Sequence, residues 1–313
     1  MARQSALRNQ ANPELERMRA EVIRKVMAQI PADGMAPTAM PGLSLYRRSE
    51  PTACNCVNYQ PELIVFLQGE KQIQVGGVTH MCNGSTFLLT SIDLPVTSQV
   101  TKATKTEPIL GLVLRLEMPL VREILSQEEF AAADFPRGAR GMAVGATTTE
   151  MLNVCSRMLD LLDSPSEIVF LGGLLHRELL YRLLRGPQGR HLRAIATLGE
   201  QTNRTAKAVA WLKANYAKPL RVEELAGVAQ MGVSTLHHHF RSLTQMSPLQ
   251  YQKRLRLQAA RERMLNEGMD AASAAFEVGY ESASQFSREY SRFFGQPPMR
   301  DVRAMRNFAA EVA

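Results

Sequence analysis

The feature that most constrains the fold of this chain is a duplication near its C-terminus. When residues 222–298 are shifted against themselves by about 50 positions, chemically similar residues coincide. The large apolar members of each copy recur at helical spacing. Each copy is therefore expected to contain a helix with one buried face and one free face. The coinciding pairs are Ser234 and Ser284, Leu236 and Phe286, Phe240 and Tyr290, Leu243 and Phe293, and Pro248 and Pro298.

The expected free faces carry side chains that donate hydrogen bonds or positive charge. Such side chains can reach base edges and phosphates when a helix enters the major groove of DNA. A solvated helix face is the alternative for either helix alone, and the duplication favours DNA contact. We expect base contacts from Ser284, Gln285 and Arg288, then from Ser234, His237 and His238, and phosphate contacts from Arg241 and Arg292.

These residues lie in a segment that resembles a known family. The run Gly279-Tyr-Glu-Ser-Ala-Ser-Gln-Phe, with the ending Phe-Gly295-Gln-Pro-Pro298, closely resembles the C-terminal signature of AraC/XylS-type transcriptional regulators. Residues 224–241, followed by Met246-Ser-Pro248, look like the other helix-turn-helix of that family. The resemblance covers about a third of the chain. It implies that a long helix, expected at residues 248–266, joins the two motifs and that both recognition helices enter successive major-groove turns.

The first copy departs from the family pattern at three positions. Gly232 stands where a capping Ser is frequent before the recognition helix, and Arg221 stands where the preceding helix has one. Glycine costs little at a cap, but arginine cannot accept hydrogen bonds from the free amides, so this motif is expected to be less firmly nucleated. His238 matches Arg288, and a neutral imidazole cannot make the bidentate contact to guanine that an arginine makes.

The net charge of the chain is concentrated on the duplicated part. Of the formal +7, the residues from 203 onward carry +6, with 16 Lys and Arg against 10 Asp and Glu. A basic domain of this kind is the electrostatic footprint of a protein that binds a polyanion. The length of 313 residues suits two domains. No apolar run approaches the length of a membrane span, and no signal peptide is recognisable, so we expect no membrane partner and a cytoplasmic protein.

Residues 42–117 change to short strands separated by turn signals such as Gly76-Gly77. About seven short strands at this spacing predict a small antiparallel barrel or sandwich. Residues 61–69 and 91–95 resemble the cupin-like N-terminal domain of one branch of the same regulator family, which implies a barrel that senses a small molecule. The expected strands are residues 63–68, 71–75, 78–82, 86–90, 96–100 and 109–116.

Catalytic and metal chemistry find little support in the sequence. Metal-dependent cupins bring two histidines and a carboxylate together on strands, whereas the barrel region offers only His80. The triplet His237-His238-His239 cannot close on one ion, because neighbouring residues of a helix point about 100° apart. We therefore predict no metal, no cofactor and no enzymatic activity. We expect His239 to be partly buried beside the apolar stripe.

Cys54 and Cys56 form the most suggestive pair among the four cysteines. Their spacing would place both thiols on one face of a strand. Such a pair is a candidate sensor of oxidants or electrophiles if a thiol is exposed and acidified, and buried packing is the alternative.

Two helical stretches, residues 150–163 and 165–185, separate the barrel from the duplicated part. The second is more apolar than one neighbour could cover, which indicates burial against both the barrel and a second subunit. The resemblance also implies a homodimer formed through helices after the barrel; a monomer with a thicker core is the alternative. We expect Asn12 to cap an N-terminal helix, Thr202 or Asn203 to cap the first helix of the last domain, and Asp270 to cap a later one.

The sequence thus predicts an α+β multidomain protein with a cupin-like antiparallel β-barrel, flanking helices and an all-α C-terminal domain of two helix-turn-helix motifs. The predicted function is sequence-specific transcriptional regulation through double-stranded DNA, controlled by a small-molecule effector, with RNA polymerase as a further partner. Alternatives are an architectural DNA-binding protein without a sensor, or a cupin-type enzyme fused to a DNA-binding domain. The expected parts are a sensor barrel with its N-terminal helix at residues 1–145, a helical dimerisation segment at 146–186, a linker at 187–201 and a DNA-binding domain at 202–313.

Overall fold

A computed structural model of the chain describes residues 12–127, 141–186, 189, 192–193 and 199–312. The first element is α1 (Pro13–Gln29), and its start follows the sequence prediction. The Asn12 side chain accepts a hydrogen bond from the backbone amide of Glu14, and Pro13 occupies the first helical position, where no amide hydrogen is needed. No helix in the described part of the chain is both long enough and apolar enough to cross a membrane.

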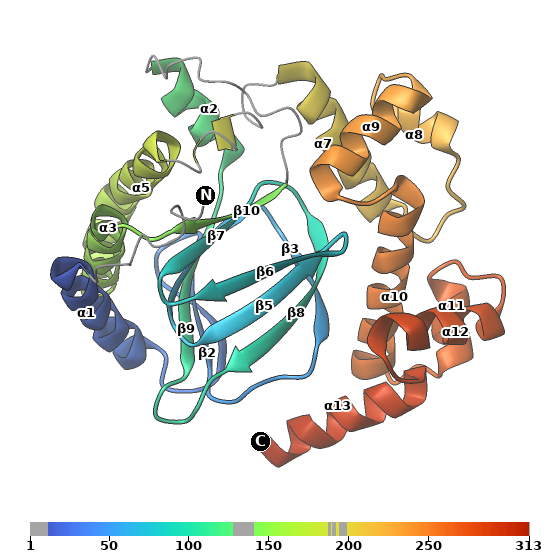
Figure 1. Ribbon diagram of the computed structural model, residues 1–313, viewed down its shortest axis with the longest axis horizontal. Coiled ribbons are helices and arrows are strands. Elements are labelled where there is room, and N and C mark those ends of the chain that lie inside the picture. Colours follow the sequence, from blue (N-terminus) through green and yellow to red (C-terminus); the bar gives the residue numbers. More distant parts are fainter. Residues whose placement is uncertain (1–11, 128–140, 187–188, 190–191, 194–198, 313) are drawn as a thin grey trace, which may run out of the picture.

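Two antiparallel sheets form the N-terminal domain (Figure 1). The larger has the strand order β1-β2-β9-β4-β7-β10 and the smaller β3-β8-β5-β6. All six predicted strands are present, and β1, β2, β3 and β10 were not predicted individually. The strands are β1 (Gly34–Pro37), β2 (Leu43–Arg48), β3 (Asn55–Tyr59), β4 (Glu62–Gln68), β5 (Glu70–Val75), β6 (Val78–Asn83), β7 (Thr86–Thr90), β8 (Leu94–Lys102), β9 (Ile109–Arg115) and β10 (Met142–Ala146).

The larger sheet is buried on both faces, which explains the continuous apolar run of β4. Leu63, Val65 and Leu67 point outward into a cluster shared with helices, whereas Ile64 and Phe66 point between the two sheets. Alternate residues of a strand face opposite sides, so a strand covered on both sides loses the polar alternation of a surface strand.

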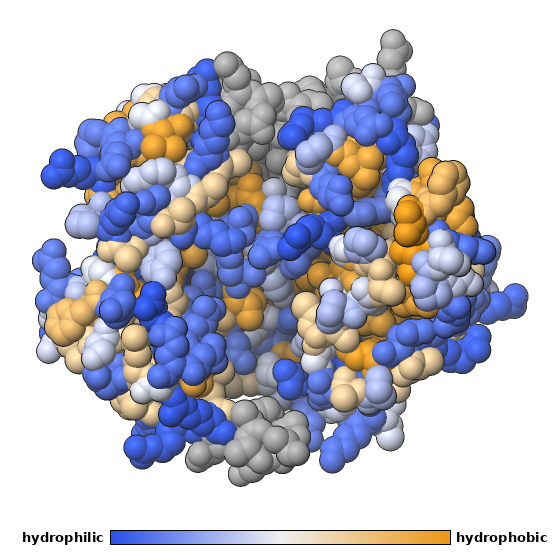
Figure 2. Space-filling model, turned by 180° about the vertical axis from the view of Figure 1, so that it is seen from behind, coloured by the Kyte–Doolittle hydropathy of each residue, from blue (hydrophilic) through white to orange (hydrophobic). Residues whose placement is uncertain are grey.

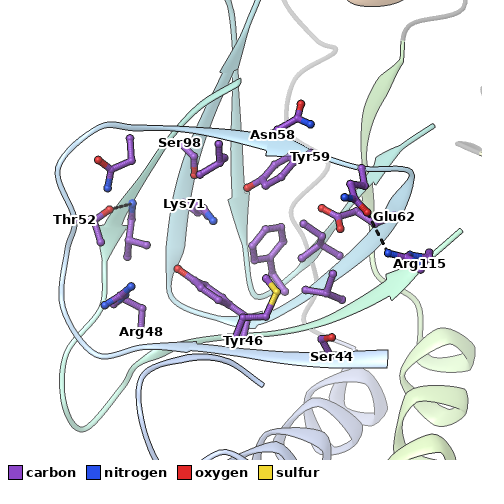
Figure 3. A pocket seen from close by; sticks show the side chains of 18 of the residues that line it. Ser44, Tyr46, Arg48, Thr52, Asn58, Tyr59, Glu62, Lys71, Ser98 and Arg115 are labelled. Atoms are coloured by element: carbon purple, nitrogen blue, oxygen red, sulfur yellow. Dashed lines mark hydrogen bonds between the residues drawn. The ribbon is translucent and has the colours of Figure 1, made fainter. Parts of the chain in front are cut away.

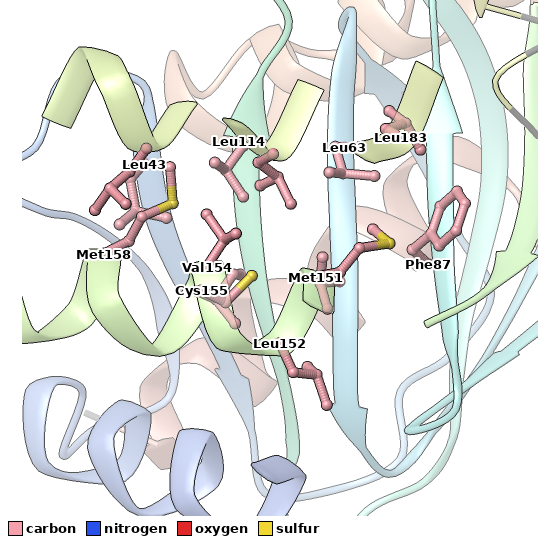
Figure 4. Close-up of a cluster of buried hydrophobic side chains, with 14 of the residues drawn as sticks. Leu43, Leu63, Phe87, Leu114, Met151, Leu152, Val154, Cys155, Met158 and Leu183 are labelled. Carbon is pink, nitrogen blue, oxygen red and sulfur yellow. The ribbon is translucent and has the colours of Figure 1, made fainter. Parts of the chain in front are cut away.

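Helices cover the outer face of the larger sheet, and Figure 4 shows their side chains meeting those of the strands. Met151, Leu152 and Met158 pack there against Leu63 and Leu114, which makes this helical segment part of the same core as the sheet. The elements are α2 (Met118–Gln127), α3 (Thr149–Asp160), the 3-10 turn η1 (Leu161–Asp163), α4 (Pro165–Glu167), the π-helical η2 (Ile168–Gly172) and α5 (Gly173–Arg185).

The C-terminal domain is entirely helical among its described residues, as predicted. The expected long helix at 248–266 coincides with α10, and Asp270 caps α11 as expected. The cap prediction at Thr202 or Asn203 was wrong, because both residues lie inside α7, which begins at Gly199. The helices are α7 (Gly199–Ala214), α8 (Val222–Val228), α9 (Val233–Thr244), α10 (Pro248–Asn266), α11 (Ala271–Glu277), α12 (Ala283–Phe294) and α13 (Pro298–Val312).

Candidate nucleic-acid interface and ligand cavity

The first helix-turn-helix unit consists of α8 and α9. Leu236 and Phe240 of α9 are fully buried, which confirms the predicted apolar stripe. Neither Arg221 before α8 nor Gly232 before α9 makes a side-chain capping hydrogen bond, as the departures from the family pattern predicted. Gln245 ends α9 in the left-handed conformation, with its amide bonded to the carbonyl of Arg241. Packing, rather than capping, therefore holds this unit in shape.

The second unit, α11 and α12, has stronger local signals. The Asp270 side chain accepts hydrogen bonds from the amides of Ala272 and Ser273, at 2.9 and 3.0 Å. Ser282 caps α12 by accepting from the amide of Gln285 at 3.3 Å. Each cap satisfies amide groups that a helix start leaves without partners.

A buried ion pair joins α13 to the second unit. The Asp301 carboxylate accepts from Nε and Nη2 of Arg261 on α10, at 2.8 and 2.9 Å. The Tyr290 hydroxyl of α12 donates to the same carboxylate at 2.7 Å. Asp301 and Arg261 are 8% and 6% exposed, and a fork-to-carboxylate pair of this geometry fixes the relative position of the three helices.

The eight predicted DNA-contacting side chains are all exposed, four on each recognition helix. Gln285 is held by its neighbour, because its Nε2 donates to Glu289 Oε1 at 3.3 Å. The His238 and His239 rings stand edge to face at 5.3 Å between centroids. His239 is half-buried as expected, and burial lowers its pKa. The four on α9 are Ser234, His237, His238 and Arg241, and the four on α12 are Ser284, Gln285, Arg288 and Arg292.

The two predicted phosphate contacts come together although they belong to different units. Arg241 and Arg292 line one groove of about 410 Å³, together with Lys253 and Arg254 of α10. The Lys253 charge is met by Glu289, with Nζ to Oε1 at 3.0 Å. The remaining cations give this groove a positive character that suits a phosphate backbone.

A cavity of about 710 Å³ opens between the two sheets of the barrel (Figure 3). Its volume lies within the range of small-molecule sites. Its wall combines aromatic and aliphatic side chains with a few charged ones, and the charged residues are Arg48, Glu62, Lys71 and Arg115. His80 does not line this cavity.

The environment of the cavity shifts several pKa values. Burial raises the pKa of Glu62 to about 7, although Lys71 and Arg115 act in the opposite direction. Burial lowers the pKa of Lys71 and raises that of the Tyr59 hydroxyl. Each shift disfavours the charged form, because the low-dielectric interior replaces water around the group.

Cys54 lies just before β3, whereas Cys56 lies within it. Because β3 begins at Asn55, only Cys56 lies within it, which contradicts the expectation that one strand carries both thiols. Cys54 is exposed and Cys56 half-buried. Burial raises the pKa of Cys56 to about 12 despite the nearby guanidinium groups of Arg261 and Arg254. Cys56 therefore lacks the acidified thiol of a sensor, which leaves Cys54 as the candidate of the pair.

The first helix-turn-helix unit and the helices on either side of it, α7 and α10, dock directly on the barrel. Asp93, just before β8, forms an ion pair with Lys213 of α7 at 2.6 Å, and its carbonyl accepts from the Tyr251 hydroxyl of α10 at 2.8 Å. On the same surface the Gly141 amide donates to the carbonyl of Leu243 at 2.8 Å. The apolar residues of this unit and of the barrel interior form one continuous cluster.

Two strands that line the cavity, β5 and β8, extend to the contact between the barrel and the C-terminal domain. Lys71 lies on β5, whose turn brings Gly76 so close to Gln245 that an added Cβ would lie 2.3 Å from the Gln245 Cβ. Ser98 and Val100 lie on β8, which begins beside Asp93.

Sequence reasoning missed the cavity residues and the docking contact. One signal was available for Lys71, because it shares a strand face with Ile73 and Val75, both of which are buried. A cation on the apolar face of a strand indicates a polar site inside the barrel. Asp93 carried no local signal, since its partners lie 120 and 158 residues away in the chain.

Both the N-terminal and the C-terminal regions of the chain are similar to known protein families. Residues 39–191 match the family described as AraC-type transcriptional regulator N-terminus, and residues 225–304 match a helix-turn-helix domain. The transcriptional activator RhaS of Yersinia pestis (strain Pestoides F) is 31% identical over 105 residues, which cover 34% of this chain and 38% of RhaS. RhaS of Klebsiella pneumoniae (strain 342) is 30% identical over 119 residues, which cover 37% of this chain and 42% of that relative. The matched part thus spans only about two fifths of these relatives.

The fold is also similar to that of a solved structure. A variant of ToxT from Vibrio cholerae in its apo form superimposes with a TM-score of 0.50 at 12% identity, covering 83% of this chain and 96% of ToxT. The shared order is a β-rich N-terminal domain followed by a helical C-terminal domain. Because both regions match and are joined in this order, the chain belongs to the AraC family of transcriptional regulators.

Proposed function

We propose that the protein binds specific DNA sequences through both recognition helices and regulates transcription from them, without enzymatic activity of its own. The observation that carries this proposal is the pair of exposed polar faces on α9 and α12, each backed by buried apolar residues, Leu236 and Phe240 on α9 and Phe286 and Tyr290 on α12. The excess of positive charge in the C-terminal part supports it, since phosphate contacts supply much of the affinity for DNA. Action in the cytoplasm and contact with RNA polymerase at the promoter belong to the same proposal.

We assign base contacts first to Ser284, Gln285 and Arg288 on α12. Arg288 can form a bidentate contact with guanine, whereas His238 at the matching position of α9 offers one donor when neutral. The second unit would therefore contribute more to sequence discrimination than the first.

Replacement of Arg288 by alanine should weaken binding to the preferred duplex by about 1 to 3 kcal/mol and relax specificity at one base pair. Arg288 is exposed and lies outside the core, so the fold should be unaffected. The measurement is selection of bound duplexes from a random pool at near-physiological salt, with the parent protein in parallel. Arg17→Ala is the matched control, because it removes the same charge from an exposed position on α1.

A motif spanning two adjacent major-groove turns would support the proposal. Equal weakening on every sequence would instead make Arg288 a phosphate contact. If neither protein enriches a motif, with or without metabolite extracts in the pool, the architectural alternative is favoured.

We propose that the barrel cavity binds an effector that acts on the first recognition helix. Strands β5 and β8 both line the cavity, and the residues next to them contact the C-terminal domain. Gly76, directly after β5, approaches Gln245 at the end of α9, and Asp93, directly before β8, contacts Lys213 of α7 and Tyr251 of α10. A ligand that binds more tightly to one arrangement of these strands would shift the population of DNA-binding domains that are positioned for DNA.

We also propose a homodimer formed through the helices outside the barrel. Four apolar residues, three in η2 and one at the start of α5, are exposed rather than packed. Figure 2 shows hydrophobic residues at the surface on the side that carries these helices. Phe170 and Val169 are 75% and 92% exposed. An uncovered apolar strip of this kind is typical of an interaction surface. The four residues are Val169, Phe170, Leu171 and Leu174.

Phe170→Glu should convert the dimer into a monomer with little change in fold stability, because an exposed side chain contributes within about 0.5 kcal/mol. Light scattering coupled to size-exclusion chromatography measures the change. Met81→Glu, at an exposed apolar residue of β6, is the control and should leave the dimer intact. A parent protein that is already monomeric, or a Phe170→Glu variant that remains dimeric, would remove this surface from the proposal.

The predicted division of the chain is kept as a proposal with one adjustment. Because α3 and α5 share the core of the barrel, residues 146–186 belong to the sensor domain while carrying the proposed dimer surface. The DNA-binding domain then begins with α7 at Gly199, within the segment predicted as the linker 187–201.

A further inference from the structure

Lys71 is a cation in the wall of the barrel cavity that has neither an ion-pair partner nor a hydrogen-bond acceptor among the described residues. In the described part of the chain its amino group has no hydrogen bond and no carboxylate within 4.0 Å. Its Nζ lies 4.8 Å from the centre of the Tyr46 ring and 5.7 Å from that of the Tyr59 ring. Figure 3 shows the amino group in the cavity, with the Tyr59 ring beside it and the Tyr46 ring below it.

Two further donors near Lys71 are buried without partners. Tyr59 is only 8% exposed, and its buried hydroxyl lies near Ser98 but makes no hydrogen bond of good geometry in the described part of the chain. Arg48 has a buried Nε that is likewise without a partner. Leaving buried donors unpaired is unfavourable, because each has lost its hydrogen bonds to water and gained none in return. Three donors with no acceptor of their own indicate that a ligand supplies the acceptor.

The charges of the wall favour an anion over a cation or a neutral ligand. Arg48, Lys71 and Arg115 provide three positive charges, and Glu62 is the single carboxylate among the lining residues. In Figure 3 Glu62 and Arg115 stand at one end of the cavity, away from Arg48 and Lys71. A second anionic group at that end would meet the carboxyl group of Glu62, so one negative charge suits the cavity better than two.

The rest of the wall is suited to an apolar body. Ile64, Phe66, Val100 and Val113 line the cavity beside the two tyrosine rings. Burial of apolar ligand surface against such side chains would contribute affinity in proportion to the area removed from water.

We propose that the cavity binds an organic acid with one carboxylate and an aromatic or aliphatic body, and that the carboxylate is held by Lys71 and the Tyr59 hydroxyl. Its role as an effector rests on the function proposed above, whereas its binding does not. The contact is a charge-assisted hydrogen bond in a partly desolvated site, where such bonds are strongest.

Calorimetric titration of the full-length protein tests the proposal with three acids, phenylacetate, naphthylacetate and nonanoate, each beside its primary amide. The amide preserves the size and the apolar body and removes the charge. At least one acid should bind, about 10- to 100-fold more tightly than its amide. Lys71→Met should abolish this preference and leave amide binding unchanged, which also shows that the cavity is intact. Lys71→Arg should restore the preference for the acid.

Lys102→Met is the matched control, because Lys102 is exposed at the end of β8 and does not line the cavity. Equal binding of acid and amide, a preference that survives Lys71→Met, or no binding of any acid up to about 1 mM would overturn the proposal. Duplex selection is a separate measurement. Acid binding without an effect on DNA binding would support this site and contradict the effector function. Recovery of a DNA motif without acid binding would contradict this site and support the proposed DNA-binding function.

Discussion

Asp301→Ala is expected to destabilise the second helix-turn-helix unit by about 3 to 5 kcal/mol, because it leaves the Arg261 guanidinium buried without its counter-charge. The Tyr290 hydroxyl loses its acceptor in the same step. Hydrogen exchange followed by mass spectrometry resolves the effect by region. Amides of α12 and α13 should exchange about 10²- to 10³-fold faster, while those of α9 should change little, since the two units belong to different apolar clusters.

The double variant Asp301→Leu with Arg261→Met separates the unpaired charge from the loss of packing. Replacing both partners of a buried pair by apolar residues is frequently neutral, so much of the protection of α12 should return. If Asp301→Ala leaves the exchange of α12 unchanged, the pair does not hold α13 against the unit. If the double variant is no better than Asp301→Ala, the carboxylate stabilises these helices mainly through Tyr290.

Gly279→Ala should disrupt the turn between α11 and α12 and cost roughly 2 to 5 kcal/mol. Gly279 has a φ of +89°, where a residue with a Cβ costs about 1 to 2 kcal/mol. An added Cβ would also lie 1.9 Å from the carbonyl oxygen of Ala217, and that backbone is tied to α10 by Arg256. Overpacking against a fixed backbone adds about 1 to 3 kcal/mol. Thermal unfolding of the full-length chain and affinity for a selected duplex should both decline.

Gln230 provides the matched control at the corresponding turn of the first unit. It also has a positive φ, of 51°, but it already carries a Cβ. Gln230→Ala should therefore be nearly neutral, since neither backbone strain nor steric overlap is new. Equal effects of the two substitutions would show that side-chain contacts, rather than the close approach to Ala217, determine the cost at Gly279.

The helical part of the fold could be predicted closely because its signals are local. Ser247 and Pro248 start α10 with a capping box and a proline at its first position, and Asp270 caps α11 with its own side chain. The apolar spacing in α9 and α12 then fixed which side chains would be exposed. The capping prediction at residues 202–203 failed because capping residues also occur inside helices, where nothing local distinguishes them.

The contents of the barrel were harder to predict, because they depend on contacts between distant strands. The strand β5 was recognised from its alternation, but the meaning of Lys71 required knowing that Tyr46 of β2 and Tyr59 of β3 lie beside it. Cys56 illustrates the same limit. Its spacing from Cys54 suggested a shared strand face, whereas the start of β3 at Asn55 depends on pairing with β8.

The long helix α10 belongs to two cores at once. Tyr251 and Leu255 in its first half pack with the barrel and the first unit, whereas Leu257 and Met264 in its second half pack with the second unit. Effector binding would therefore be coupled mainly to the half of the operator that the first helix-turn-helix unit contacts. Coupling between two binding sites is reciprocal. Binding of that half of the operator would therefore change the affinity for the effector by the same factor by which the effector changes the affinity for that half. The other half of the operator, bound by the second unit, would contribute the same affinity whether or not the cavity holds a ligand.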